Sequence, residues 1–264
     1  MPYSLVDTHC HLDDPGFESD RNLLIDKARM AGVQSIIVPG IAASEFSLIQ
    51  NLAESNKRVH ACAGLHPLFM DAHNESSFEQ LQQLVVDGSI IAVGECGLDH
   101  SDKHADKLRQ LDCFERQISL SIEYKLPLII HANRAVEAVL LSVGKHDRAY
   151  GVIHSFNGSL EQAERFIALG FKLGFGGAVT YPRATRLRKL ICELPLDAMV
   201  LETDAPYQSG AAHNGQRNQP AWILEVLESV AELRDESMDE IARVTTLTAC
   251  NLFNLPNDQH DNTD

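Results

Sequence analysis

Short apolar runs alternate along the chain with stretches in which apolar residues recur at helical spacing. Several of the runs are nearly all apolar and rich in isoleucine and valine. That pattern is typical of strands buried on both faces of a parallel sheet. We therefore predict eight strands, at residues 5–9, 35–39, 59–64, 90–95, 128–131, 152–154, 171–175 and 199–203.

The segments between these strands carry the signals that begin and end helices. Ser76 and Glu79 have the spacing of a capping box, and Ser159 is placed to cap a later helix. Gly32 and Gly170 follow the last turn of their helical patterns, where a glycine is favoured. We predict helices at residues 21–32, 76–88, 107–125, 159–170 and 238–256.

The number of repeats predicts the fold. Eight strand–helix repeats in 264 residues average about 33 residues each, which suits a TIM (β/α)8 barrel. A doubly wound open sheet shares the same alternation and is the alternative within the α/β class. Since no segment resembles a linker, we expect a single domain over residues 1–264, with residues 257–264 as a polar tail.

Composition narrows the function. No apolar run approaches the ~20 residues that a membrane span needs, so we expect no membrane partner. The six cysteines include no Cys-x-x-Cys pair and the start of the chain lacks a signal-peptide pattern, which favours reduced thiols in a cytoplasmic protein. A net charge of −15 argues against coating nucleic acid by bulk electrostatics. It does not exclude an enzyme that acts on phosphates through bound cations.

Histidines and carboxylates gather at the carboxyl ends of the predicted strands. In a barrel these ends converge on one face, where active sites are built. They are His9 and His11 after the first strand, His66 after the third, Glu95 and Asp99 at the fourth, His131 at the fifth, His154 at the sixth and Asp204 at the eighth.

Four imidazoles with two carboxylates suit two divalent ions and a metal-activated hydroxide between them. His9 and His11 are two residues apart, so on a strand they point to the same side. Cys10 then points away toward the core, and Asp7 would lie one step deeper and support a ligand. Mixed nitrogen and oxygen ligands suit zinc, manganese or iron, with magnesium at a more oxygen-rich position.

Each of these residues also has an ordinary explanation. A lone His-x-His is weak evidence for a metal, and His131 by itself is more often a structural histidine. Glu95 could form a salt bridge, and Asp204 could cap a turn. Together, however, these explanations require several ionisable groups to end apolar strands by chance, although charged groups avoid buried strands. The joint pattern therefore favours a metal site.

Basic and glycine-rich segments follow two other strands. Arg134 comes shortly after His131 and is expected on the rim of the site. A basic cluster at Arg183, Arg186, Arg188 and Lys189 has two interpretations, a charged helix face or a rim that grips phosphate. The glycines of residues 174–177 (GFGG) fit a turn or a close backbone approach to a ligand, but not a nucleotide-binding loop.

Six motifs, in order, resemble the signatures of the TatD family of metal-dependent DNases: VDTHCH, GLHP, GECGLD, IIHANR, HSFNG and ETDAPY. The segment LGFKLGFGGAVTYPRA is similar to the YjjV-like branch of that family. The resemblance runs from about Val6 to Pro256. This sequence departs from the family pattern at Ala132, Asn133 and Gln219, on the side where substrate is expected.

The resemblance implies a TIM barrel of the amidohydrolase type that binds two divalent ions. One ion would be bound by His9 and His11 with Asp204, and the other by His131 and His154. Glu95 would bridge the two ions, and Asp204 would also accept a proton from the attacking water. His66 would contact the phosphate of the substrate. Arg134, expected on the rim, is our second candidate for binding substrate.

The implied activity is exonuclease hydrolysis of DNA, and a monomer without a protein partner is expected. Two alternatives stay open. The same metal chemistry would serve another ester or amide bond, such as a lactone or the ester that joins an amino acid to tRNA. A third possibility is a binding protein with a structural metal, although such sites have closed four-ligand shells.

Overall fold

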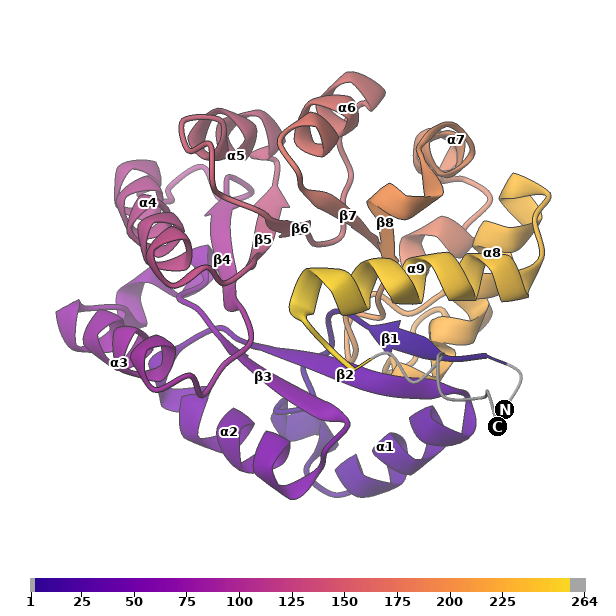
Figure 1. Ribbon diagram of the computed structural model, residues 1–264, viewed down its shortest axis with the longest axis horizontal. Coiled ribbons are helices and arrows are strands. Elements are labelled where there is room, and N and C mark those ends of the chain that lie inside the picture. The colour runs from indigo at the N-terminus through magenta and orange to yellow at the C-terminus, as the bar shows by residue number, and fades with distance from the viewer. Residues whose placement is uncertain (1–2, 257–264) are drawn as a thin grey trace. The chain divides into compact units, whose positions relative to one another are not determined.

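Strands and helices alternate in a computed structural model that describes residues 3–256 of the chain (Figure 1). Every predicted strand is present, although the ends differ. The strands are β1 (Leu5–Asp7), β2 (Val33–Gly40), β3 (Val59–Ala63), β4 (Val93–Asp99), β5 (Leu128–Asn133), β6 (Gly151–Ile153), β7 (Lys172–Phe175) and β8 (Met199–Leu201).

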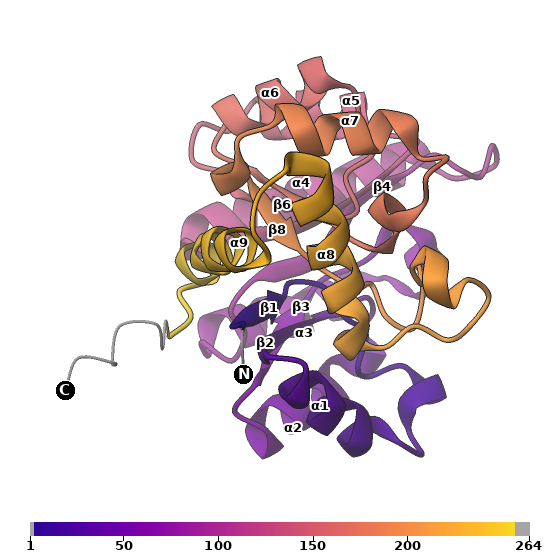
Figure 2. The same ribbon diagram turned by 90° about the vertical axis from the view of Figure 1, so that its right-hand side faces the viewer.

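A helix follows each strand, and the last two helices, α8 and α9, come after β8 without another strand between them (Figure 2). The helices are α1 (Arg21–Met30), α2 (Phe46–Ser55), α3 (Glu75–Val86), α4 (Lys107–Tyr124), α5 (Val136–Val143), α6 (Leu160–Ala168), α7 (Thr185–Glu193), α8 (Ile223–Arg234) and α9 (Met238–Phe253). Short 3₁₀ helices lie in the connections, among them η1 (Pro15–Phe17), η3 (Pro67–Ala72), η6 (Ala211–His213) and η7 (Pro220–Trp222).

The sheet has the strand order β1-β2-β3-β4-β5-β6-β7-β8. A doubly wound sheet would reverse its strand order at a switch point, and this order does not reverse. The molecule is therefore a TIM barrel, and the predicted fold class is confirmed. None of the helices in residues 3–256 is long and apolar enough to cross a bilayer. The six cysteines all lie among the described residues, where none forms a disulfide. The predicted tail, 257–264, lies outside the described residues.

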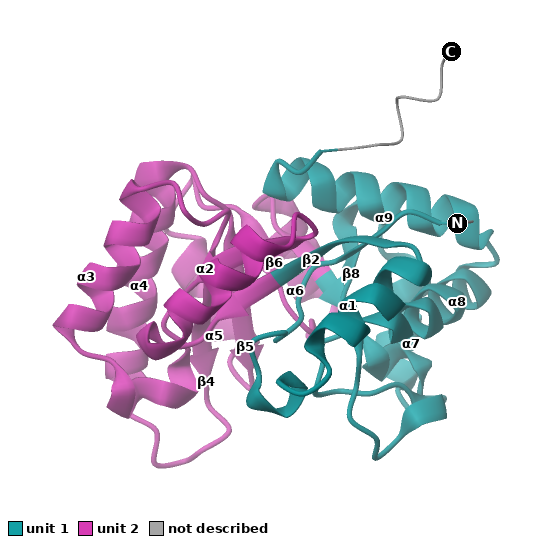
Figure 3. Cartoon of the chain, turned by 90° about the horizontal axis from the view of Figure 1, so that it is seen from below, with its two compact units in different colours: residues 1–37, 174–264 teal, residues 38–173 magenta. Residues whose placement is uncertain are grey.

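The chain divides into two compact units (Figure 3). The first takes in the described residues up to Ile37 and those from Gly174 onward, so it is built from the two ends of the chain. The second is Val38–Leu173. The expectation of a single domain stays a prediction.

In the first unit, helix α9 packs against β1 and β8. Its buried residues include Ile241, Thr245, Ala249 and Leu252, three or four positions apart, which is the spacing of one helical face. The hydroxyl of Thr246 donates to the main-chain oxygen of Ser4 at 2.7 Å. Helix α9 thus covers β1. Its apolar face is removed from water by this packing, which stabilises the fold.

In the second unit, helix α4 packs on β4 and supports the ends of the neighbouring strands. Two of its buried side chains are glutamines, which lie on the packed face because each bonds to the main chain. Gln110 accepts the N–H of Asp99 at 3.1 Å, and Gln117 accepts that of Leu65 at 2.8 Å. The helix therefore fixes the segments that carry Asp99 and His66.

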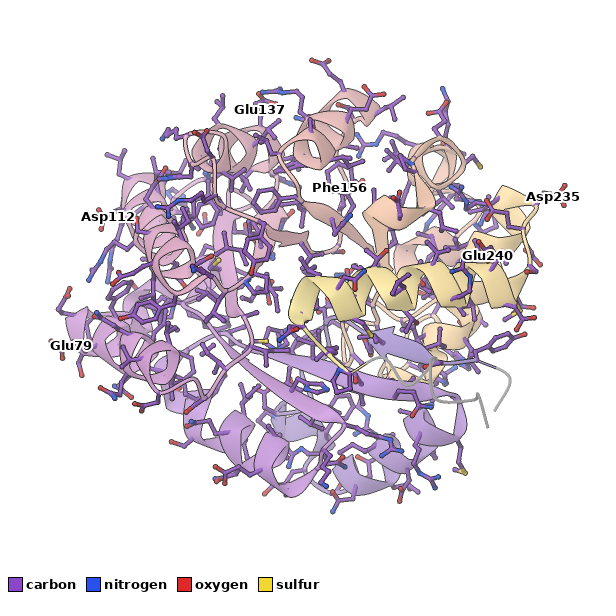
Figure 4. The ribbon with its side chains drawn as sticks, viewed as in Figure 1. Glu79, Asp112, Glu137, Phe156, Asp235 and Glu240 are labelled. Carbon is purple, nitrogen blue, oxygen red and sulfur yellow. The ribbon has the colours of Figure 1, made fainter. Side chains whose placement is uncertain are left out.

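Helices α5 and α6 lie side by side in the second unit. Glu137 on α5 accepts hydrogen bonds from Gln162 and Arg165 on α6, both at 3.0 Å (Figure 4). These groups are exposed, so the bonds contribute little to stability. The ring of Phe156, in the segment between β6 and α6, meets that of Phe166 on α6 edge to face, with the ring centroids 6.1 Å apart, and both residues are buried.

The predicted helix starts were correct in one case and wrong in another. Ser159 caps α6, and Gln162 returns a bond to it, which confirms the prediction. The cap of α3 is Asn74 rather than Ser76, and the reciprocal partner is Ser77 rather than Glu79. Asparagine caps as well as serine does, so the helix begins two residues earlier than the Ser-x-x-Glu pattern predicted.

Candidate metal-binding clusters

The first cluster lies in the first unit, where the segments after β1 and β8 run side by side. The N–H of Asp204 donates to the oxygen of His9 at 2.8 Å, and the N–H of His11 donates to the oxygen of Ala205 at 2.8 Å. These main-chain bonds join residues far apart in sequence. They bring Asp204 to the two histidines, which is the grouping that the family resemblance implied.

The ligand atoms of the first cluster converge on one point. The Nε2 atoms of His9 and His11 are 3.2 Å apart, and they lie 3.6 and 3.5 Å from Oδ1 of Asp204. Ligands on a tetrahedral ion with bonds of about 2.0 Å are roughly 3.3 Å from one another. All three residues are buried. The donor set therefore fits a divalent transition metal without rearrangement.

Asp7 supports this cluster through the main chain. Its Oδ1 accepts the N–H of His9 at 3.3 Å and that of Thr203 at 2.9 Å, and its Oδ2 accepts the hydroxyl of Thr203 at 2.6 Å. Burial raises the pKa of Asp7 to about 7, against these hydrogen bonds, which lower it. The supporting role expected for Asp7 is thus present, and it acts on the strand ends. Cys10 is buried and points to the oxygen of Ala205, in agreement with its predicted place in the core.

The second cluster lies in the second unit, on β4 and β5. Glu95 is the third residue of β4, and His131 is the fourth of β5. The prediction that these two residues end their strands is therefore wrong. Both strands continue because Gly97 pairs with His131 and Asp99 pairs with Asn133 in parallel register. His66 follows β3 and caps η3.

Carboxylates surround the imidazole of His131 on two sides. Its Nδ1 is 3.1 Å from Oε1 of Glu95, and its Nε2 is 2.8 Å from Oδ2 of Asp99. His66 approaches the same Oε1 with its Nε2 at 3.3 Å. The ligand atoms of His66, Glu95 and His131 all lie within 4.8 Å of one another, so this group could also hold a cation.

The charges in the second cluster favour a protonated His131 as long as no metal is bound. Burial lowers its pKa, but the hydrogen bonds with Asp99 and Glu95 outweigh burial and raise the pKa to about 9. Burial by itself would raise the pKa of Asp99. Hydrogen bonds from His131, Ser101 and Asn133 outweigh burial and hold that pKa well below its ordinary value. A metal bound at Nδ1 would replace that proton, while Asp99 would keep hold of Nε2.

Two glycines in the motifs are required by close contacts. A Cβ on Gly97, where φ is +128°, would lie 2.1 Å from the main-chain oxygen of His131. A Cβ on Gly174 would lie 2.2 Å from Oε2 of Glu202. The backbone of the GFGG segment therefore lies close to the buried carboxylate of Glu202. One of the two interpretations of the sequence was a close approach to a ligand, and here the neighbour is a side chain of the protein itself.

The remaining predicted residues follow their strands. His154 comes directly after β6 and is buried, and its N–H donates to the oxygen of Ile130 at 2.9 Å. Arg134 is exposed immediately after β5, in a left-handed conformation with φ of +51°. In the basic cluster, Arg188 donates to the oxygen of Val179 and Lys189 pairs with Glu193, which supports a charged helix face for these two.

Two carboxylates were not assigned to the predicted ligand set. Asp99 was placed at a strand end without a role, and it is the partner of His131. Its signal was present, because Glu95 and Asp99 are four residues apart and therefore share one side of a strand. Glu202 belongs to the ETDAPY motif and is buried. Its burial is what marks it as a candidate, and the sequence did not reveal that burial.

The comparisons with known proteins agree with these features. The family described as TatD related DNase matches residues 6–254. The chain is 41% identical to an Escherichia coli protein described as the uncharacterized metal-dependent hydrolase YjjV, over 95% of this chain and 98% of that protein. It is 32% identical to the Bacillus subtilis metal-dependent hydrolase YabD, over 95% and 99% of the two chains.

A solved structure supports the same conclusion. The crystal structure of Escherichia coli YjjV, described as a TatD homologue, superposes with a TM-score of 0.93 at 40% identity. The match covers 97% of this chain and 100% of the other. The resemblance of the motifs, the fold and the near-complete coverage all agree. The chain therefore belongs to the TatD family and is a metal-dependent hydrolase.

Proposed function

We propose that the protein is a deoxyribonuclease, an exonuclease that hydrolyses phosphodiester bonds of single-stranded DNA with the help of two divalent ions. The observation that carries this proposal is the convergence of His9, His11 and Asp204 at the ligand separations of a tetrahedral ion. The family description, TatD related DNase, supports the choice of substrate.

We assign the metal-holding role to the six predicted residues, His9, His11, Glu95, His131, His154 and Asp204. When bound, such ions polarise a phosphoryl oxygen and lower the pKa of water. Asp204 also accepts the proton of the attacking water, and its Oδ1 lies on the side of the two histidines. Its Oδ2 accepts a bond from Nε2 of Gln208 at 2.6 Å, which fixes the orientation of the carboxylate.

His66 binds the substrate phosphate in this proposal, and its tautomer supports that role. Its Nδ1 accepts the N–H of Leu68 at 3.2 Å, so in the neutral ring the proton is on Nε2. In this tautomer Nε2 carries a proton, which it can donate to an anionic oxygen. Arg134, exposed just after β5, supplies a second group for the phosphate backbone.

The proposal is tested by following the release of nucleotides from an end-labelled single-stranded oligonucleotide with zinc, manganese or magnesium. We expect hydrolysis that depends on the added ion, and a loss of about 100-fold or more in His131→Asn and Glu95→Gln. His104→Asn is the matched control, because His104 is exposed outside both clusters. The substrate panel also includes a lactone and an aminoacyl-tRNA ester.

Hydrolysis of those esters without loss of DNA under any of the ions would overturn the assignment to DNA. It would keep the metal-dependent hydrolase and support the ester alternative. A chain that binds metal tightly and hydrolyses none of the substrates would instead support a metal-binding protein.

A further inference from the structure

Tyr207 is the one large aromatic side chain beside the first cluster that faces solvent among the described residues. The residue is 55% exposed, although it follows Asp204 by only three positions. Its ring meets that of His11 edge to face, with the centroids 5.9 Å apart. An exposed aromatic ring thus lies in contact with a residue that we assign to metal binding.

Tyr207 is held in this position by hydrogen bonds of its phenol hydroxyl and of its main chain. The phenol hydroxyl donates to Oδ2 of Asp14 at 2.9 Å, and Oδ1 of Asp14 is fixed in turn by the N–H of Gly16. The N–H of Tyr207 donates to the oxygen of Asp204 at 2.8 Å, and Asn218 donates to the oxygen of Tyr207 at 2.7 Å. The ring is therefore oriented in advance of any ligand.

The setting of this ring indicates that it binds a ligand. Its orientation is maintained by the hydrogen bonds of its hydroxyl and its main chain and by the edge-to-face contact with His11, while much of the residue stays exposed. An exposed aromatic ring that is already oriented can contact a flat group at little entropic cost.

We propose that Tyr207 stacks on a nucleobase of the substrate and thereby positions the neighbouring phosphodiester at the first cluster. This inference rests on the proposed function, since it names how the DNA is bound. Stacking recognises every base because every base has a π-face, which suits an exonuclease that must accept any sequence. Removing such a stacked ring weakens binding by roughly fivefold or more.

The experiment compares oligonucleotides that differ only by an abasic residue at the first, second or third nucleotide from the attacked end. Binding is measured by fluorescence anisotropy with the protein free of metal, and kcat/KM is measured with metal present. In the wild type, we expect one abasic position to weaken binding and kcat/KM by roughly fivefold or more. In Tyr207→Ala, that same position should change neither quantity by more than about twofold, because the stacking partner is gone.

Two further variants complete the design. Tyr207→Phe keeps the ring and loses the bond to Asp14, so we expect it to retain the discrimination between base and abasic residue. Tyr150→Ala removes a tyrosine whose hydroxyl bonds to the oxygen of Lys125, at the amino end of β6, and should discriminate as the wild type does.

The outcomes separate this inference from the proposed function. A wild type that hydrolyses DNA and treats the abasic oligonucleotides like intact ones overturns the role of Tyr207 alone. A wild type that binds but does not hydrolyse DNA overturns the proposed function, and the binding series still decides on stacking. A wild type that neither binds nor hydrolyses DNA overturns both.

Discussion

His131 illustrates how a single residue is prepared for metal binding. One ring nitrogen faces Glu95, and the other is held by Asp99 at 2.8 Å. A ligand histidine commonly donates its second nitrogen to a carboxylate, which fixes the orientation and the tautomer of the ring. The chain supplies that carboxylate from the adjacent strand, because Asp99 lies on β4 and His131 on β5.

We predict that Asp99→Asn weakens metal affinity and lowers hydrolysis by about 10–100-fold, because the amide no longer attracts the second proton of the His131 ring. Metal titration monitored by calorimetry measures the affinity. Asp102→Asn is the control, since Asp102 is exposed in the loop that follows and bonds to the N–H of His104. Equal affinities in Asp99→Asn and the wild type would contradict this role.

We also predict that Thr203→Val lowers the free energy of unfolding by about 1–3 kcal/mol, because it leaves the buried carboxylate of Asp7 without the hydroxyl that it accepts. Denaturation in urea measures the change. Thr185→Val makes the same substitution at an exposed residue and is expected to stay within about 0.5 kcal/mol of the wild type. A similar effect at both positions would argue against the buried bond.

At the scale of the elements, the two predicted helix caps show when a sequence pattern is sufficient to locate the start of a helix. Both predicted starts were based on serine, and Ser159 was correct because its reciprocal partner Gln162 lies three residues later. Before the apolar stripe of α3, however, three capping candidates lie within four residues, namely Asn74, Ser76 and Ser77. Composition could not choose among them, because the direction from which the chain enters the helix depends on η3.

We predict that Asn74→Ala lowers the free energy of unfolding by about 1 kcal/mol, as expected for the loss of a helix cap. Ser76→Ala should have an effect of less than about 0.5 kcal/mol, because Ser76 is an exposed residue inside α3. Thermal or urea denaturation of the two variants decides between the caps. A larger loss of stability in Ser76→Ala than in Asn74→Ala would contradict the Asn74 cap and support the predicted cap at Ser76.

The ends of β4 and β5 show why a hydrophobic pattern misplaced the ends of these strands. The apolar pattern stops at Val93, so the strand was predicted to end at the first charge, Glu95. The strand continues because Glu95 and Asp99 are buried against the imidazoles of His66 and His131. A hydrophobic pattern cannot reveal a strand that buries polar residues, when partners from elsewhere in the chain offset the cost of that burial.

For the whole molecule, the number of strand–helix repeats favoured a TIM barrel over a doubly wound sheet, and the strand order decides between them. The structure adds that His9, His11 and Asp204 belong to one compact unit, and Glu95 and His131 to the other. That division could not be read from the sequence, because it depends on which strands and helices pack most extensively. Whether all six ligands serve the same two ions stays a prediction.

We predict that a divalent ion stabilises the whole fold. At about 100 times its dissociation constant, an ion that binds only the folded state contributes about 2.7 kcal/mol, which raises Tm by roughly 5–10 °C. Differential scanning fluorimetry with and without zinc or manganese measures the shift, and a chelator should reverse it. In His131→Asn the shift should be smaller. An unchanged Tm across the ions would contradict metal binding by the folded chain.

The main-chain bond between residues 9 and 204 also bears on when the first cluster becomes complete during synthesis. A ribosome makes His9 and His11 more than 190 residues before it makes Asp204. Until then the histidine pair has neither its carboxylate nor the loop that positions it. We therefore expect the ion of the first cluster to enter only after Asp204 has been made and has joined the two histidines.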